Sequence, residues 1–235
     1  MRLFSVLLLS LLVAACQPAT EESNQPNTKA SPAEKIMQPE ATVAERFVEG
    51  KDYRVLEQVI APAAFEPQAG EAGYVIEFLW PGCPHCQEFN PTIVAFALEH
   101  PEVTVIKRAA PANERWAMDA RVFFALREIS ETNLDDELLA FYQGVRVNHE
   151  RLPTQPDLNR FMAEHGIAED AFAAAYEDPA LTDKLRVVLE DMRGANISSV
   201  PTVVVNGRYV VEAPAPHSQA ESQRYFALIN HLLTL

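Results

Sequence analysis

The stretch "YVIEFLWPGCPHCQEFNP", residues 74 to 91, decides the fold that this sequence predicts. Its first part, "YVIEFLW" (74–80), is nearly all apolar, which is typical of a central strand buried on both faces, although it contains one acid, Glu77. The chain continues into "QEFNPTIVAFALEH" (87–100), whose apolar residues recur with the period of a helix. The two cysteines between these segments therefore fall where a strand ends and a helix begins.

Cys83 and Cys86 stand at a position with chemical consequences. The first turn of a helix has unpaired N–H groups and a partial positive charge, which stabilise a thiolate and lower its pKa. Pro84 suits the first helical turn, because its missing N–H would have been unpaired anyway. The i, i+3 spacing lets both sulfurs approach within one turn. We expect Cys83 to be the exposed, attacking sulfur and Cys86 to lie deeper and resolve the mixed disulfide. A His85 imidazolium would favour the thiolate further.

The size of the expected Cys83 pKa shift indicates whether the cysteine pair oxidises or reduces other thiols. A Cys83 pKa about two units below ambient pH would stabilise the reduced form by roughly 2.7 kcal/mol. For a two-electron couple, that stabilisation raises the reduction potential by about 60 mV. A couple whose reduced form is stabilised accepts electrons readily, so the motif predicts a protein that oxidises other thiols.

The cysteine pair has two other interpretations. A structural disulfide is possible in any exported protein, but so short a loop closes little chain, and this one opens a helix. A metal site is disfavoured because Cys83, His85 and Cys86 lack the second ligand pair of a closed zinc site, so we predict no metal. For His85 alone, a solvated side chain is the alternative, and the spacing leaves both interpretations open.

The composition and the first residues indicate an exported globular protein. The chain has 235 residues, 48% of them hydrophobic, and a formal charge of -14, which argues against a nucleic-acid surface and which we interpret as solubility. In "MRLFSVLLLSLLVAAC" (1–16), a positive Arg2 precedes an apolar stretch. That stretch is shorter than the about 20 residues that a membrane-spanning helix needs, so we predict a signal peptide over 1–15.

The end of this signal predicts a lipid anchor. "VAAC" (13–16) resembles the bacterial lipobox, in which the cysteine is lipidated and becomes the first residue of the mature protein. An unpaired cysteine in an exported protein otherwise lacks a role, so we expect Cys16 to be lipidated; an ordinary cleaved signal is the alternative. Residues 17–40 hold four prolines and no aromatic residue, too little apolar surface to offset ordering entropy. We predict a flexible tether over 16–45 that spans roughly 25–30 Å.

The rest of the chain has a simple order. Strand patterns recur along it, at 53–60, 74–80, 102–110 and 202–211. The two strands that flank the first helix should be parallel, and Asn206-Gly207 predicts a hairpin because both residues tolerate positive φ. Residues 111–194 follow a helical pattern, and a last helix over 218–233 closes the chain. We predict a small mixed sheet with helices on both faces, interrupted by an all-helical domain.

"CPHC" after "IEF" and before a helix resembles the DsbA group of thioredoxin-fold proteins. The resemblance covers most of residues 50–235, including "GKDYRVLEQ", "VIEFLWPGCPHC", the helical insertion and "SVPTVVVNGRYVV". It implies an α/β thioredoxin fold with an inserted all-helical domain, the first formed by 46–110 and 195–235 and the second by 111–194. A lowered cysteine pKa and an oxidising couple are known properties of this group, and the resemblance implies them here.

The resemblance also implies roles for three further residues. Val200-Pro201 is similar to a loop whose proline is cis and faces the disulfide, and whose backbone pairs with a substrate strand. The residues alone favour a trans proline that opens a strand, and Ser199 departs from the glycine common in the family. Glu77 matches a buried acid whose pKa should rise and which would exchange a proton with Cys86; an acid on a solvated strand face is the alternative.

The function implied is that of a thiol:disulfide oxidoreductase, a dithiol oxidase that donates disulfides to unfolded or reduced exported proteins. The redox-active disulfide Cys83–Cys86 needs no bound cofactor, and a DsbB-like, quinone-linked membrane partner would reoxidise it. We expect a periplasmic monomer held at a bacterial membrane by its lipid. Two alternatives remain: a reductase or isomerase of the same fold, or a non-enzymatic, anchored binding lipoprotein with an inert disulfide. Valine before the proline resembles the oxidases more than the isomerases, and residues 17–45 are too polar for an isomerase's dimerisation domain.

Overall fold

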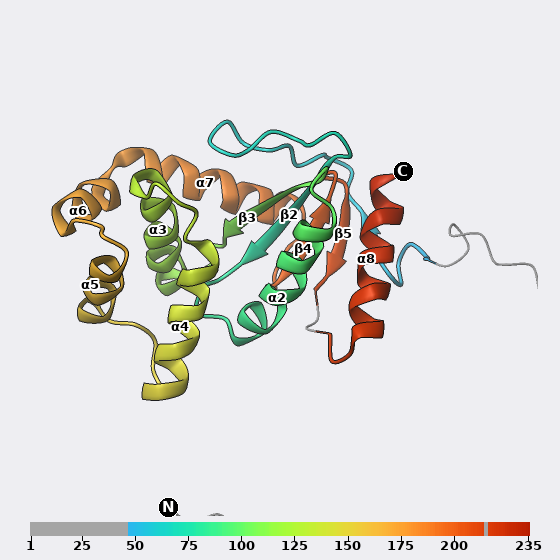
Figure 1. Cartoon of the computed structure of the whole chain (residues 1–235). Helices are drawn as coiled ribbons and strands as arrows, with labels where there is room; N and C mark the ends of the chain where they lie inside the picture. Colours follow the sequence, from blue (N-terminus) through green and yellow to red (C-terminus); the bar gives the residue numbers. More distant parts are fainter. Residues whose placement is uncertain (1–46, 214–215) are drawn as a thin grey trace, which may run out of the picture. The chain divides into compact units, whose positions relative to one another are not determined.

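The computed structural model describes residues 47–213 and 216–235 (Figure 1). The predicted signal peptide (1–15), the lipidation site Cys16 and the tether (16–45) lie outside these residues. Across the described ranges, no helix combines the length and the apolar character that crossing a membrane requires.

A single five-stranded sheet organises the described part of the chain. Its strands lie in the order β1-β5-β4-β2-β3, and their bounds are Arg54–Val55 (β1), Tyr74–Leu79 (β2), Thr104–Ala109 (β3), Thr202–Val205 (β4) and Tyr209–Glu212 (β5). β2 pairs in parallel with β3 and antiparallel with β4, so the predicted parallel pair is confirmed. The register places Glu77 directly beside Lys107 on the neighbouring strand.

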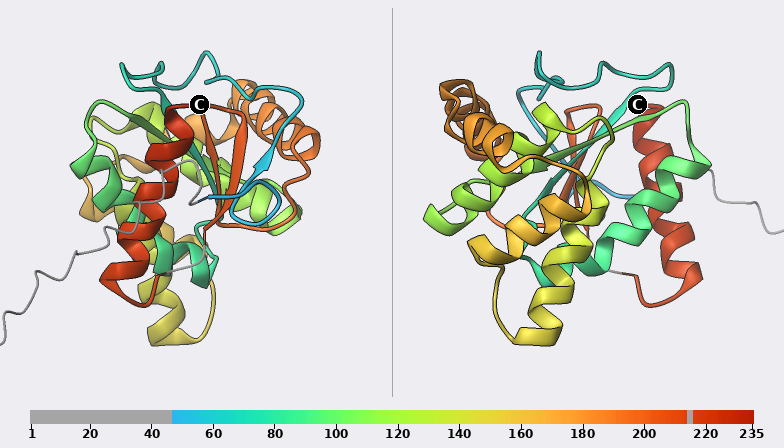
Figure 2. Two further views of the ribbon diagram at one scale, coloured as in Figure 1. Left: turned by 90° about the vertical axis from the view of Figure 1, so that its right-hand side faces the viewer. Right: turned by 60° about the vertical axis from the view of Figure 1, so that its left-hand side comes forward.

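Two helices belong to the sheet and five are inserted into it. α2 (Pro84–Glu99) connects β2 to β3, and α8 (Gln219–Leu233) follows β5. The inserted helices lie between β3 and β4 in the chain: α3 (Glu114–Ile129), α4 (Asp135–His149), α5 (Gln155–Glu164), α6 (Glu169–Glu177) and α7 (Pro179–Gly194). Figures 1 and 2 show the inserted helices gathered on one side of the sheet and α8 on the other.

The core consists of two hydrophobic clusters, one on each face of the sheet. Alternate strand residues point to opposite faces, so Val75 joins one cluster and Ile76 the other. The cluster with Val75 is completed by α2 and α8, for example by Phe89 and Ile229, whereas the cluster with Ile76 is completed by inserted helices. Helices therefore cover both faces, but the two helices outside the insertion, α2 and α8, share one face. The prediction that the sheet has helices on both faces without the insertion is wrong, because the inserted helices cover the other face.

The segment before β2 differs from its prediction. The strand predicted over 53–60 is limited to Arg54–Val55. After it, the Leu56 N–H donates to the Arg208 carbonyl and the Ile60 N–H donates to the Gly207 carbonyl, so the chain follows the β4–β5 turn and leaves the ladder. The hairpin itself is confirmed, with φ of 47° at Asn206 and 64° at Gly207. A Cβ at Gly207 would lie 2.1 Å from the Ile60 carbonyl oxygen, so this contact requires glycine.

Candidate active site

The cysteine pair lies at the N-terminus of α2, where the sequence places it. Cys83 is the N-cap residue, with extended backbone angles of φ −79° and ψ 120°, and Pro84 is the first residue of the helix. The Cys83 sulfur accepts a hydrogen bond from the Cys86 N–H at 3.4 Å. Cys83 therefore takes the place that a serine or aspartate fills in other helix caps, with sulfur as the acceptor.

The two thiols differ strongly in acidity. The pKa of Cys83 is lowered to about 6, first by a hydrogen bond with the Cys86 side chain and then by the N–H groups of Cys86 and His85, although burial opposes the shift. Burial raises the pKa of Cys86 far above its usual range, and the hydrogen bond with Cys83 adds to the effect. At neutral pH the reduced site thus holds a Cys83 thiolate and a Cys86 thiol.

The exposure of Cys83 corrects one expectation. Cys86 is fully buried, as expected, but Cys83 is itself only 7% exposed. The reason is the loop that precedes β4, since the Cys83 sulfur lies 3.6 Å from the carbonyl oxygen of Val200. The Val200 backbone therefore lies directly against the Cys83 sulfur.

The Val200-Pro201 peptide bond is cis. This agrees with the resemblance and not with the trans bond that the residues alone favour. The Thr202 hydroxyl donates to the Ser199 carbonyl at 2.8 Å, which closes the loop next to the cysteines. The backbone carbonyl of Val200 and the sulfur of Cys83 thus lie side by side.

His85 lies at the surface beside the cysteines. Its side chain is 79% exposed, and its Nδ1 lies 3.4 Å from a carboxylate oxygen of Glu88. The charge of His85 lowers the Cys83 pKa, but less than the His85 backbone N–H does. His85 therefore assists the thiolate mainly through its backbone N–H, and its ring is available to solvent and to a bound partner.

Glu77 is buried beneath the cysteine pair. It is 0% exposed, and neither carboxylate oxygen has a hydrogen-bond partner among the described residues. Burial raises its pKa to about 7, against a smaller opposing effect from Lys107. The charge of Glu77 in turn raises the pKa of Cys86, and the charge of Cys83 raises the pKa of Glu77.

Lys107 is a member of this site that the sequence reasoning missed. Its ammonium group donates to the Asn90 side-chain oxygen at 2.6 Å and pairs with Asp136, and the residue is only 7% exposed. The available signal was its position, because Glu77 and Lys107 occupy matching places in the two strands of the β-α-β unit. A buried acid and a buried base at matching positions of parallel neighbours are expected to lie side by side.

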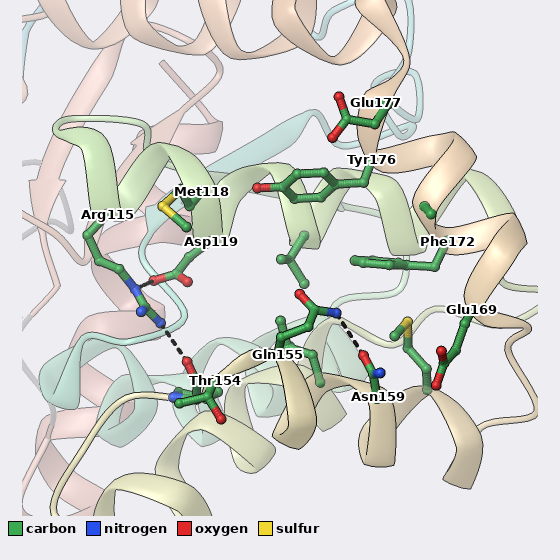
Figure 3. A pocket seen from close by; sticks show the side chains of 15 residues that line it. Arg115, Met118, Asp119, Thr154, Gln155, Asn159, Glu169, Phe172, Tyr176 and Glu177 are labelled. Carbon is green, nitrogen blue, oxygen red and sulfur yellow. Dashed lines mark hydrogen bonds and ion pairs between the residues drawn. The ribbon is translucent and has the colours of Figure 1, made fainter.

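A cavity of about 560 Å³ lies among the inserted helices α3, α5 and α6 (Figure 3). Its lining combines apolar side chains such as Met118 and Phe172 with the ion pair Arg115–Asp119. The cysteines do not line it. In the described part of the chain, no group of three or more His, Cys, Asp and Glu side chains is arranged to hold a metal ion.

Known proteins resemble this chain over most of its length. A family model described as Thioredoxin matches residues 67–225. The thiol:disulfide interchange protein DsbA of Pseudomonas aeruginosa is 27% identical over 170 residues, which are 72% of this chain and 77% of that protein. The DsbA of Azotobacter vinelandii is 31% identical over 137 residues, which are 57% of this chain and 63% of that protein.

Solved structures extend the likeness to the fold. The crystal structure of Pseudomonas aeruginosa DsbA matches with a TM-score of 0.64 at 25% identity, covering 80% of this chain and 95% of that one. A DsbA from Proteus mirabilis, solved with a non-covalently bound peptide, matches with a TM-score of 0.61 at 16% identity, covering 80% and 99%.

The fold and the cysteine pair define a thiol:disulfide oxidoreductase with a thioredoxin fold and an inserted helical domain. The chain belongs to the thioredoxin family, as a DsbA-like thiol:disulfide interchange protein with dithiol oxidase activity. The predicted family, fold class and enzyme class are thereby confirmed.

Proposed function

We propose that this protein donates the Cys83–Cys86 disulfide to unfolded or reduced exported proteins. The observation that carries the proposal is the opposite displacement of the two cysteine pKa values, because it makes Cys83 the better leaving thiolate and Cys86 the sulfur that keeps its proton.

The reaction has two exchange steps. A substrate thiolate attacks the Cys83 sulfur, a substrate–Cys83 bond forms, and Cys86 leaves and takes up a proton. Glu77, with a pKa of about 7, is partly protonated at neutral pH and supplies that proton. A second substrate thiolate then attacks the substrate sulfur of the mixed disulfide and releases the Cys83 thiolate. The substrate loses two electrons and forms its disulfide, and the enzyme gains the two electrons as a dithiol.

The loop at Val200-Pro201 is the proposed binding place for the substrate chain. Its carbonyl lies 3.6 Å from the attacked sulfur, so a peptide paired with this backbone would bring a cysteine to Cys83. The peptide complex of the Proteus mirabilis DsbA supports a peptide-like ligand in a protein of the same fold.

The remaining parts of the proposal rest on the sequence. We place the protein in the periplasm as a monomer, anchored through lipid on Cys16 and extended on the tether over 16–45. A quinone-linked membrane protein similar to DsbB would accept the electrons and restore the disulfide, with no bound cofactor. The helical segment 111–194 would act as a domain that covers the site.

The redox equilibrium with glutathione tests the oxidase function, with Cys83→Ser as the control that cannot form the disulfide. We expect a reduction potential above the range of about −200 to −230 mV that glutaredoxins show. A value near about −270 mV, as in thioredoxin, would support the reductase alternative instead. Alkylation of the reduced protein at pH 6 tests the inert-disulfide alternative: a thiolate at Cys83 reacts rapidly, and a slow reaction would contradict the proposal.

A further inference from the structure

The turn from Trp80 to Cys83 connects β2 to the active-site helix α2. It is closed by a hydrogen bond of 2.9 Å from the Cys83 N–H to the Trp80 carbonyl. The Cys83 sulfur accepts a hydrogen bond from the Cys86 N–H only if the conformation of this turn places the sulfur at the N-terminus of α2. Whatever fixes the turn therefore fixes the chemistry of the sulfur.

Helix α3 holds the first residue of this turn through its side chain. The Trp80 indole N–H donates to a carboxylate oxygen of Asp119 at 2.8 Å. Asp119 is only 3% exposed, and it also accepts from the Tyr142 hydroxyl at 2.8 Å and from the Arg115 Nε at 2.9 Å. Figure 3 shows the Arg115–Asp119 contact. Because three donors converge on one carboxylate, Asp119 is itself held in place.

The fixed indole covers the residue directly before Cys83. A Cβ on Gly82 would lie 2.5 Å from a carbon of the Trp80 ring, so the ring rests against the Gly82 backbone. On α3, Trp116 stacks on Trp80 with ring centroids 4.8 Å apart and planes 16° from parallel. The indole therefore has little freedom to move, and it restricts Gly82 in turn.

Helix α4 holds the second residue of the turn through Gln87. The Gln87 side-chain amide donates to the Pro81 carbonyl at 2.7 Å, and the residue is 5% exposed. Its other side-chain atom, the oxygen, accepts from the Arg146 guanidinium at 2.8 and 3.3 Å. Since the cation occupies the oxygen, the amide nitrogen must face Pro81, and Arg146 determines this orientation.

We propose that Asp119 and Arg146 are positioning residues for the dithiol: through Trp80 and Gln87, α3 and α4 hold the turn that places the Cys83 sulfur at the N-terminus of α2. The inserted helices thereby act on the reactivity of Cys83 without touching either sulfur. This inference rests on the exchange role of Cys83 and Cys86 proposed above, and it adds two residues to that mechanism.

The substitution Arg146→Met tests the α4 contact. It removes both donors to Gln87 and keeps much of the apolar stem, so the turn should loosen and the sulfur should lose part of its hydrogen bonding. We expect the midpoint of the alkylation profile of Cys83 to rise by about half a unit or more. The glutathione equilibrium constant should become about threefold to tenfold less oxidising, a change of about 15–30 mV. Arg146→Lys keeps one donor and should restore most of the wild-type value.

The substitution Trp80→Phe tests the α3 contact without changing any charge. It removes the donor to Asp119 and keeps an aromatic ring, so a shift in the same direction would arise from positioning and not from a lost cation. Arg121→Met is the matched control, because Arg121 is a half-buried arginine of α3 that bonds to the Tyr176 carbonyl and the Thr182 hydroxyl instead of the turn. The control should keep the wild-type profile even where its melting temperature falls.

The outcomes separate the inference from the proposed function. The proposed function is judged on the wild-type potential, and the inference on the shifts of the variants relative to the wild type. All variants are assayed below their own melting temperatures, measured by circular dichroism. If Arg146→Met and Trp80→Phe lower the melting temperature but keep the alkylation midpoint and the glutathione constant within twofold, the contacts are merely structural and the inference is wrong.

Discussion

Cys83 and Cys86 lie in one helical turn, yet their pKa values are displaced in opposite directions. The difference follows from geometry, because Cys83 caps the helix and receives backbone N–H groups, whereas Cys86 is fully buried behind it. An anion is stabilised at the first position and penalised at the second. In the proposed mechanism, this asymmetry sets the order of events, in which Cys83 forms the mixed disulfide and Cys86 keeps a proton.

Glu77 gives a prediction about stability and pH. Its pKa rises from 4.5 to about 7 on burial, so the folded protein binds this proton more tightly than the unfolded chain does. Stability is therefore lost as the pH rises from about 4.5 to 7. We expect Glu77→Gln to be about 3 kcal/mol more stable than the wild type at pH 8 and nearly equal to it at pH 4, by urea unfolding of the oxidised proteins.

The charged neighbours of Glu77 define the result that would contradict this. Lys107 lowers its pKa, and Asp135 and Asp136 raise it. Lys107 donates to Asn90 and pairs with Asp136, so its charge is already partly satisfied. A stability difference between Glu77→Gln and the wild type that stays constant from pH 4 to pH 8 would mean that Lys107 keeps Glu77 charged in the folded protein. That result would also contradict the proposed proton transfer from Glu77 to Cys86.

Strand β3 carries a fully buried arginine that connects three segments. Arg108 forms two hydrogen bonds with Glu66, at 2.7 and 2.6 Å, and one with Asp191 of α7, at 2.6 Å. It also donates to the Ala61 carbonyl at 3.0 Å. Both Arg108 and Glu66 have side chains that are 0% exposed. The pair thus joins the segment before β2 to the sheet and to the inserted helices.

Removing only one partner of this ion pair should lower the free energy of unfolding more than removing both charges. Arg108→Met leaves the Glu66 carboxylate buried without its cation, which we expect to cost about 3–5 kcal/mol in the free energy of unfolding. The double variant Arg108→Met with Glu66→Gln removes both charges and should recover at least half of that loss. Urea unfolding of the wild type, the two single variants and the double variant at one pH measures the coupling. Two independent, additive losses would show that the ion pair is not the cause.

Local signals account for the elements that could be predicted. The apolar period fixes β2 and α2, and Asn206-Gly207 fixes the hairpin, because each depends on residues adjacent in the chain. The spacing of Ser218 and Glu221 also predicts a capping box at the start of α8, but only half of it forms. The Glu221 N–H bonds to the Ser218 hydroxyl, but the Glu221 carboxylate accepts from the His217 N–H and not from Ser218. A shift of one residue at a cap is beyond what spacing can decide.

Contacts between distant segments were not predictable from one sequence. Trp80 and Asp119 are 39 residues apart, and Gln87 and Arg146 are 59 apart. Nothing in the spacing of these residues indicates their pairing, because it depends on how the inserted helices pack on the sheet. Arg108 likewise lies in a strand that the sequence predicts, but nothing in the sequence indicates that the Arg108 side chain is buried. The sequence thus predicts the parts of the site that depend on residues adjacent in the chain. It does not predict the contacts that depend on how the inserted helices pack on the sheet.

Redox state and folding are linked across the whole protein. The Cys83 thiolate, which in the proposed mechanism makes the disulfide a good oxidant, stabilises the reduced folded chain and has no equivalent in the oxidised one. Burial beneath the Val200 loop and the capping of α2 are consequences of the complete fold, so the unfolded chain has an ordinary Cys83. The difference in the free energy of unfolding between the reduced and oxidised proteins therefore measures how strongly the fold stabilises the Cys83 thiolate.

We expect the reduced protein to gain stability relative to the oxidised protein as the pH rises from 6 to 9. The pKa of Cys83 is lowered from 9.0 to about 6 by folding, so its stabilisation is complete above pH 9 and is lost as the pH falls through 6. The window ends at pH 9 because Cys86 begins to ionise there in the unfolded chain only, which reverses the trend. Urea unfolding of both forms at pH 5, 7 and 8.5 measures the difference. Cys83→Ser, which cannot form the disulfide, should show no such gain when its stability is compared with that of the oxidised wild type. A wild-type difference independent of pH would show that the folded protein does not stabilise the thiolate.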